Sequence, residues 1–145
     1  MATSWHLTID CASATALAEF WAAALGYVPA PVPNGFATWQ DWLTEHRVPE
    51  DEWDMGAFIS DPDGVAPSIS FLQVPKAKTV KNRLHLDIQI SGGRHQPLEE
   101  RWPRVAAEVE RLAGLGARVL QEVTVDDRPD HVIMADPESN EFCVV

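Results

Sequence analysis

Two histidines stand at corresponding places in two similar short segments of the chain. His6 begins the string HLTID, and His85 lies within the string LHLDI. Both strings read as β-strands, in which alternate side chains share a face. His6 then lies on one face with Thr8 and Asp10, and His85 with Asp87. Imidazole and carboxylate groups on one face can bind a small ligand or exchange protons, and a polar pair without chemistry is the plainer alternative.

A cysteine and a glutamate alternate in a third strand-like segment, Glu141–Val145. Glu141 shares a strand face with Cys143, so it could act as a base or as a ligand beside the thiol. Buried cysteines generally behave as small hydrophobic residues. The simpler interpretation is therefore that Cys143, like Cys11, only fills space in the hydrophobic core.

Aromatic residues gather in the segment 28–55, which is rich in proline and acidic residues and holds Trp39, Trp42 and Trp53. We interpret it as a long inserted loop, and long loops inside compact domains tend to be functional. The tryptophans could form a lid on a planar ligand, with Trp39 as a substrate-binding residue. A satellite hydrophobic cluster under the loop is the alternative.

Basic residues cluster between Lys76 and Arg83, where four of the eleven lysines and arginines of the chain occur. Such a run is usually a solvated loop. It could also form a rim that attracts an anionic substrate. Arg83 has the strand parity of His85 and could clamp a substrate carboxylate through two hydrogen bonds.

Composition narrows the class of protein. A chain of 145 residues with 46% hydrophobic and 23% charged residues is typical of one ordered domain. The net charge of −11 argues against nucleic acid as a partner, because the chain as a whole repels phosphate backbones. No apolar run is long enough to predict a membrane span. Two cysteines and the absence of a leader pattern favour a cytoplasmic location.

An internal repeat organises the chain. A helix with an apolar stripe over 17–25 follows the first strand, with Ser13 as a candidate N-cap and Gly26 as its end. A second helix, expected to begin near Pro103 and to end at Gly116, follows the strand 84–88.

Turn strings repeat as well, as SDPDG at 60–64 and ADPESN at 135–140, each followed by a strand. The sequence therefore predicts an α+β fold in which duplicated βαβββ modules, about 5–75 and 82–145, form a cup-shaped mixed sheet with the helices outside.

These strings resemble the vicinal oxygen chelate superfamily, which includes glyoxalases, fosfomycin-resistance transferases, extradiol dioxygenases and bleomycin-resistance proteins. The resemblance covers nearly all of residues 1–145 and is closest to bacterial glyoxalase-like domains. Its carriers are the strings HLTID at 6–10, FWAAALGY at 20–27, KNRLHLD at 81–87 and ADPESNEF at 135–142.

The resemblance implies a metal site. It places first-strand ligands at His6 and His85, and the third ligand, usually a glutamate, at Cys143. Two imidazoles and a thiolate favour Zn²⁺ and other softer metals over Mg²⁺ or Mn²⁺. The candidate divalent metals are Zn, Ni, Mn and Fe. Cys143 could equally mark a lost site. A fourth position falls at Phe71 or Gln73, neither of which is a strong ligand.

Two functions follow from the resemblance. The first is a metal-dependent lyase, isomerase, transferase or dioxygenase, in which the ion polarises vicinal oxygens of a small anionic or aromatic molecule, Glu141 moves a proton, and Thr8, Trp39, Arg83 and Asp87 bind substrate. The second is a metal-free protein of the bleomycin-resistance type that sequesters such a molecule. The resemblance also implies a homodimer, since members of the superfamily commonly pair. No nucleophilic triad, P-loop or dinucleotide fingerprint offers a rival chemistry.

Overall fold

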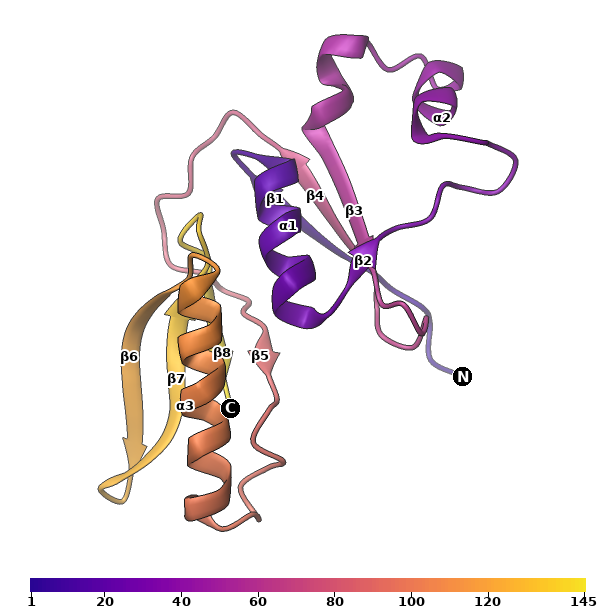
Figure 1. The fold of residues 1–145 in the computed structure, drawn as a ribbon. Coiled ribbons are helices and arrows are strands. Elements are labelled where there is room, and N and C mark those ends of the chain that lie inside the picture. The colour runs from indigo at the N-terminus through magenta and orange to yellow at the C-terminus, as the bar shows by residue number, and fades with distance from the viewer. The chain divides into compact units, whose positions relative to one another are not determined.

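The computed structural model describes every residue from Met1 to Val145, and the chain divides into two compact units. Unit 1 comprises Met1–Ala77 and unit 2 comprises Lys78–Val145. Each unit holds one sheet and one long helix (Figure 1). None of the helices combines the length and the apolar character that crossing a bilayer requires.

Unit 1 is a four-stranded mixed sheet in the order β1-β4-β3-β2, in which β1 runs parallel to β4 and the other pairs are antiparallel. Two short helices stand between β2 and β3. The elements are β1 (Leu7–Cys11), α1 (Ala14–Leu25), β2 (Val28–Pro29), α2 (Trp39–Glu45), the 3-10 helix η1 (Glu50–Met55), β3 (Gly56–Ser60) and β4 (Ile69–Gln73).

Unit 2 has the same topology, with the strand order β5-β8-β7-β6 and β5 parallel to β8. Its elements are β5 (Asp87–Ile88), α3 (Leu98–Gly114), β6 (Arg118–Val125), β7 (Arg128–Ala135) and β8 (Glu141–Val144). The predicted α+β fold with a repeated βαβββ order is therefore confirmed.

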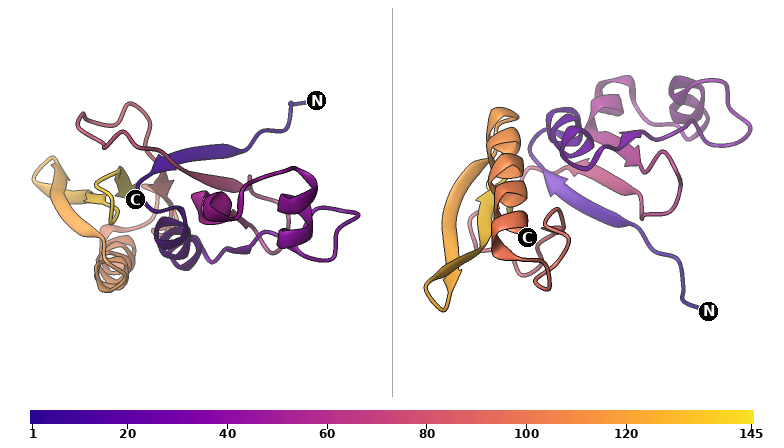
Figure 2. Two further views of the ribbon diagram at one scale, coloured as in Figure 1. Left: turned by 90° about the horizontal axis from the view of Figure 1, so that it is seen from above. Right: turned by 60° about the horizontal axis from the view of Figure 1, so that its bottom comes forward.

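Helix α1 forms where the sequence predicts it. Its Ser13 cap accepts a hydrogen bond from the Ala16 backbone N–H, and Gly26 ends the helix with a φ of 71° that favours glycine. The helix packs on one face of its sheet (Figure 2), so that the predicted apolar stripe is buried. This core consists of Leu17, Phe20, Trp21 and Ala24 against Ile59, Ile69 and Phe71.

Helix α3 covers one face of the second sheet (Figure 2) and buries Val105 and Leu112. The strands contribute Val132, Met134, Phe142 and Val144 to this core. The predicted start near Pro103 is wrong, because α3 begins at Leu98. Pro103 lies in the second turn, where it cannot donate a backbone hydrogen bond to the carbonyl of Glu99, and the helix continues through it.

Two further details differ from the sequence-based expectation. The strand predicted over 84–88 is shorter, since only Asp87–Ile88 pairs as β5, although the backbone N–H of Cys143 still donates to the carbonyl of Leu86. The segment 28–55 is not a bare loop, because it folds into α2 and η1. Thr38 and Asp41 cap α2 reciprocally, which explains why seven residues can hold a helix there.

The duplicated Asp-Pro turns are built alike. Asp61 accepts hydrogen bonds from the backbone N–H groups of Asp63, Val65 and Ala66, and these bonds lower the pKa of its carboxyl. Asp136, which is fully buried, accepts from the N–H groups of Glu138 and Asn140. Each carboxylate thereby fixes the loop that leads into the last strand of its unit.

Candidate functional site

Three potential metal ligands converge in unit 2. One donor atom each from His85, Asp87 and Cys143 lies within 4.8 Å of the others. His85 Nδ1 lies 3.1 Å from Asp87 Oδ1 and 3.8 Å from Cys143 Sγ. The sheet causes this arrangement, because parallel pairing sets Asp87 of β5 directly opposite Cys143 of β8.

Cys143 lies on the face of the sheet that α3 leaves free. Its neighbours Phe142 and Val144 are fully buried on the helix side, and alternation turns the thiol to the opposite face. Burial raises the pKa of the thiol to about 11, and the nearby Asp87 carboxylate adds to this effect. Without a metal, the protonated thiol, the carboxylate and the imidazole satisfy one another by hydrogen bonding.

The donor set fits a borderline metal. It combines a nitrogen, an oxygen and a sulfur donor, a mixture that suits Zn²⁺ and its neighbours in the first transition row better than the all-oxygen preference of Mg²⁺. Three protein ligands leave a position free for a bound molecule. Binding would require Cys143 to lose its proton, since the thiolate is the form that ligates metals.

Glu141 stands two residues before Cys143 on the same strand face and is engaged. Its carboxylate forms an ion pair with Lys81, and its backbone N–H donates to the side-chain oxygen of Asn82 over 3.3 Å. These contacts tie the segment 81–83 to β8. Lys81 would have to release Glu141 before that carboxylate could act as a base.

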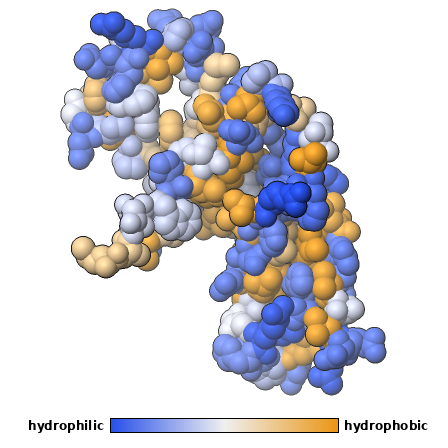
Figure 3. All heavy atoms as spheres, turned by 180° about the vertical axis from the view of Figure 1, so that it is seen from behind, coloured by the Kyte–Doolittle hydropathy of each residue, from blue (hydrophilic) through white to orange (hydrophobic).

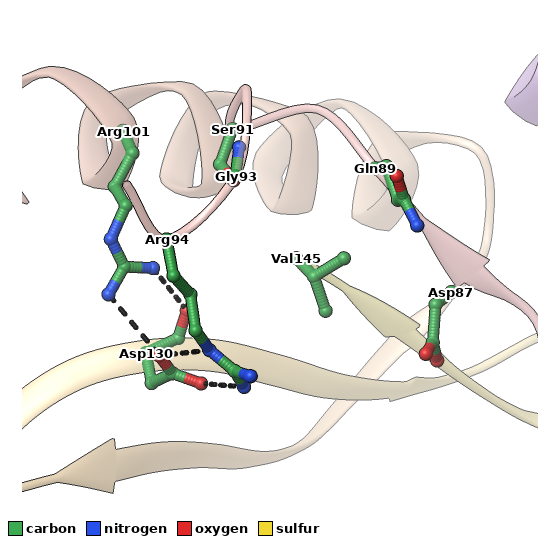
Figure 4. A pocket seen from close by; sticks show the side chains of 8 residues that line it. All are labelled: Asp87, Gln89, Ser91, Gly93, Arg94, Arg101, Asp130 and Val145. Carbon is green, nitrogen blue, oxygen red and sulfur yellow. Dashed lines mark hydrogen bonds and ion pairs between the residues drawn. The ribbon is translucent and has the colours of Figure 1, made fainter. Parts of the chain in front are cut away.

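A cavity of about 290 Å³ lies beside the donor group. Asp87 and Gln89 line one end of it, Val145 lies between, and Arg94 and Arg101 meet at the other end (Figure 4). The loop at this end turns through Gly93, which has a φ of 100°, and a Cβ there would lie 3.0 Å from the His95 ring. Asp87 connects the donor group to the cavity, because it is one of the three potential ligands and also lines the cavity wall.

The arginine end of the cavity is organised by Asp130, whose side chain is 5% exposed. Arg94 donates to both of its carboxylate oxygens, at 3.0 and 2.7 Å, and Arg101 donates to one oxygen and to the Asp130 carbonyl. His131 Nδ1 lies 2.9 Å from the carboxylate. The hydrogen bonds from Arg94 and His131 hold the pKa of Asp130 well below its usual range.

The predicted residues of unit 1 are placed as follows. His6 is exposed immediately before β1, and Thr8 is exposed on β1. Trp39 opens α2, where its ring stacks on Phe58 with the centroids 5.1 Å apart and the planes 6° from parallel. Phe71, one of two candidates for a fourth ligand, is 1% exposed in the core and faces no site.

In unit 2, the structure brings together three of the predicted residues, His85, Asp87 and Cys143, with Glu141 on the same strand. Arg83 is exposed in the segment before β5. Sequence reasoning missed Arg94, Arg101 and Asp130. No motif relates them, because they come from a loop, a helix and a strand, and the only signal was the unusual pair of glycines at 92–93 before an arginine.

Comparison with known proteins agrees with the fold described above. The model of the glyoxalase-like domain family matches residues 6–145. A possible glyoxalase from Bacillus cereus superposes with a TM-score of 0.60 at 14% identity, over 100% of this chain and 99% of that one. A glyoxalase/bleomycin resistance protein/dioxygenase family enzyme from Burkholderia phytofirmans PsJN gives 0.59 at 13%, over 96% and 94%.

A third similar structure is a single-residue mutant of the genomically encoded fosfomycin resistance protein FosX from Listeria monocytogenes, in complex with Mn(II) and 1S,2S-dihydroxypropylphosphonic acid. Its TM-score is 0.60 at 14% identity, over 99% of this chain and 90% of that chain. At such identities the likeness shows the fold alone. No curated protein matches the chain. The family model spans almost all of the sequence, and on that ground the chain belongs to the glyoxalase-like domain family.

Proposed function

We propose that the chain is a metal-dependent enzyme whose metal is held by unit 2 and whose substrate is a small anionic molecule with neighbouring oxygens. The observation that carries this proposal is the position of Asp87, shared by the donor group and the cavity. A molecule in that cavity would lie within reach of the donor group at one end and of Arg94 at the other.

His85, Asp87 and Cys143 would hold the ion. A divalent metal bound there supplies Lewis-acid polarisation of the oxygens of a bound molecule. Arg94 supports an anionic substrate, since its side chain is 73% exposed and only its Nε and Nη2 groups bond Asp130, which leaves further N–H donors for a ligand. Asp130 holds that guanidinium in place.

Several residues keep roles that are predictions. His6 is a further candidate ligand, and Thr8, Trp39 and Arg83 are candidate substrate contacts. Glu141 is the candidate proton carrier, and its ion pair with Lys81 would have to open for that role. The FosX complex contains Mn(II).

We expect this chain to form a homodimer. Light scattering that shows only a 16 kDa species would argue against the dimer.

Elemental analysis tests the proposal. The full chain is stripped with a chelator, dialysed against Zn²⁺, Ni²⁺, Mn²⁺ or Fe²⁺, and its metal content is measured beside His85→Ala and Cys143→Ala variants. We expect about one ion per chain, lost in both variants. His95→Ala is the matched control, because this exposed histidine lies in the same unit outside the donor group, and it should retain the metal.

A metal-free binding protein is the second candidate. It is favoured by the hydrogen bonding among the Cys143 thiol, Asp87 and His85, which satisfies these groups without an ion. Failure of every tested metal to bind would sink the enzyme proposal. Binding of small carboxylates by chelator-treated protein, lost in Arg94→Ala, would then support the second candidate.

A further inference from the structure

Unit 1 contains a cavity that the proposed metal site does not use. Its volume is about 480 Å³, in the range of small-molecule sites. The walls come from α2, η1, β3 and β4, so the segment 39–55 and the sheet build it together. All of its lining residues belong to unit 1.

The walls are aromatic. Trp39, Trp42 and Trp53 line the cavity with Phe58 and Met55. Trp39 stacks on Phe58 and meets the edge of Trp42, with ring centroids 5.7 Å apart. Large apolar surface is left uncovered here, since Met55, Phe58 and Leu72 are 38%, 39% and 48% exposed. Exposed apolar residues gathered in one hollow mark a binding site more often than scattered ones do.

The tryptophan rings are fixed before any ligand arrives. The Trp39 indole N–H donates to the carbonyl of Ala30 at 3.3 Å, and the Trp53 indole N–H donates to the carbonyl of Val48 at 3.0 Å. Because these donors are already used, both rings offer the cavity π-surface in place of hydrogen-bond donors. Rigid aromatic walls of this kind favour a flat ligand, with little entropy lost on binding.

The electrostatics favour a cation. Glu52 is the one charged residue that lines the cavity, and Gln73 adds a polar group. Six of the fourteen residues from Asp41 to Asp54 are acidic, against one arginine, Arg47. Figure 3 shows hydrophilic residues over the outer end of this part of unit 1, with hydrophobic residues visible between them. A cation would be attracted both by the carboxylates and by the indole faces.

We propose that this cavity binds a planar aromatic cation, such as a quaternised nitrogen heterocycle, at a site built by residues of unit 1 alone. The flat ring would lie against the tryptophan walls, and the positive charge would face Glu52. The inference rests on unit 1 alone and needs no metal, so it can fail while metal binding in unit 2 holds, and the reverse. If it holds, Trp39 serves this cavity and is no longer a candidate contact for the anionic substrate.

Three bicyclic probes of matched size test it: N-methylquinolinium, neutral quinoline at pH 8, and 2-naphthoate. Calorimetric titration of the full chain in a chelator-containing buffer of low salt should give saturable binding in the order cation, neutral, anion. We expect the cation to bind at least about tenfold more tightly than the anion, with a difference that shrinks as salt screens the charges. Indole N–H resonances of Trp39 and Trp53 should shift on binding.

Two variants locate the site. Trp39→Ala should abolish binding of all three probes. Glu52→Gln, an exposed change that leaves the walls intact, should reduce the advantage of the cation several-fold and leave quinoline binding unchanged. Asp63→Asn removes a charge from unit 1 outside the cavity and should have no such effect. Absence of saturable binding by N-methylquinolinium, equal binding of the anion, or indifference to Glu52→Gln in folded protein would each overturn the proposal.

Discussion

The two units share one topology and carry opposite chemistry. Unit 1 holds ten acidic and two basic side chains, a net charge of −8, whereas unit 2 holds twelve acidic and nine basic ones, a net charge of −3. The cavity of unit 1 has aromatic walls and one carboxylate, and that of unit 2 has two arginines beside a donor group. One sheet order therefore serves as a frame for two cavities of different chemical character.

The chemical difference between the units arises from the segments that each unit adds to the shared βαβββ order. Unit 1 inserts α2 and η1 between its second and third strands, and this insertion carries the tryptophans and most of the excess negative charge. Unit 2 lacks the insertion and instead places polar residues on β5, on β8 and in the loop before α3. The sheet and the one long helix of each unit supply its core, and the insertion contributes no buried residue, so the chemistry could change without loss of the fold.

Cys143 is the softest donor of the proposed ligand set in unit 2, so its replacement should change metal binding the most. Cys143→Glu replaces a soft donor with a hard one, so the preference for Zn²⁺ over Mn²⁺ should fall by about a hundredfold. Competition titrations with a metal indicator measure it. The variant must first be shown to be folded by circular dichroism, because position 143 is only 7% exposed. An unchanged preference in folded protein would remove Cys143 from the ligand set.

A second prediction concerns the stability of unit 2. Asp130→Asn leaves the charge of Arg101, whose side chain is 11% exposed, without its partner, so we expect a loss of about 1–3 kcal/mol in the free energy of unfolding. Urea denaturation measures this loss. Arg111 pairs with Glu108 on α3, and because Arg111 is 44% exposed, water can solvate its charge when the partner is removed, so Glu108→Gln should cost less than about 1 kcal/mol. Equal losses of unfolding free energy in the two variants would show that the buried Asp130 network stabilises unit 2 no more than the Arg111–Glu108 pair does.

The Asp130 carboxylate also makes the stability of unit 2 depend on pH. Its folded-state pKa lies below the unfolded value of about 3.9, so the stabilisation is present above that value and is lost as the pH falls toward the folded-state pKa. The difference in stability between the wild type and Asp130→Asn should therefore narrow as the pH drops below about 4. A difference that stays constant from pH 7 to pH 3 would contradict this origin.

A further prediction distinguishes Arg94 from Arg83 as the contact for the substrate anion. Glycolate carries a carboxylate and a neighbouring hydroxyl, and its affinity for the zinc-loaded protein should fall about tenfold in Arg94→Ala. Arg83→Ala tests the sequence-based alternative in the same titration. A larger loss with Arg83→Ala would move the anion contact from the loop before α3 to the segment before β5.

The smallest expected effect lies in unit 1. Thr38→Ala removes the N-cap of α2, including the hydrogen bond from the Asp41 backbone N–H, and should cost about 1 kcal/mol locally. Hydrogen exchange of the amides in 39–45 should accelerate while those of unit 2 stay unchanged. Acceleration throughout both units would contradict a local effect of this cap.

Most of the fold could be predicted from the sequence, because its signals are local. The stripe at Leu17, Phe20 and Trp21, the cap at Ser13 and the paired Asp-Pro turns each depend on residues close together in the chain. The start of α3 could not be predicted in this way. Proline at position 103 looked like a helix opening, yet the apolar contacts of α3 outweigh the one hydrogen bond that it removes.

The candidate site was predictable in part, from the family resemblance and from strand alternation. The resemblance named His85 and Cys143 as ligands, strand alternation placed Asp87 beside His85 as a substrate contact, and the structure brings the donor atoms of all three together. Arg94 and Asp130 are 36 positions apart in the sequence and meet only through the pairing of a loop with β7. The stacking of Trp39 on Phe58 likewise depends on how an irregular segment returns to its sheet.

Cobalt substitution tests whether His85, Asp87 and Cys143 bind a metal in unit 2. Titration of the chelator-treated chain with Co²⁺ should produce a sulfur-to-metal charge-transfer absorption that saturates at about one ion per chain. Cys143→Ser should lose this absorption, and Cys11→Ser, the matched cysteine control in unit 1, should keep it. Saturable binding of Co²⁺ without the charge-transfer band, or with a band that survives Cys143→Ser, would contradict the account.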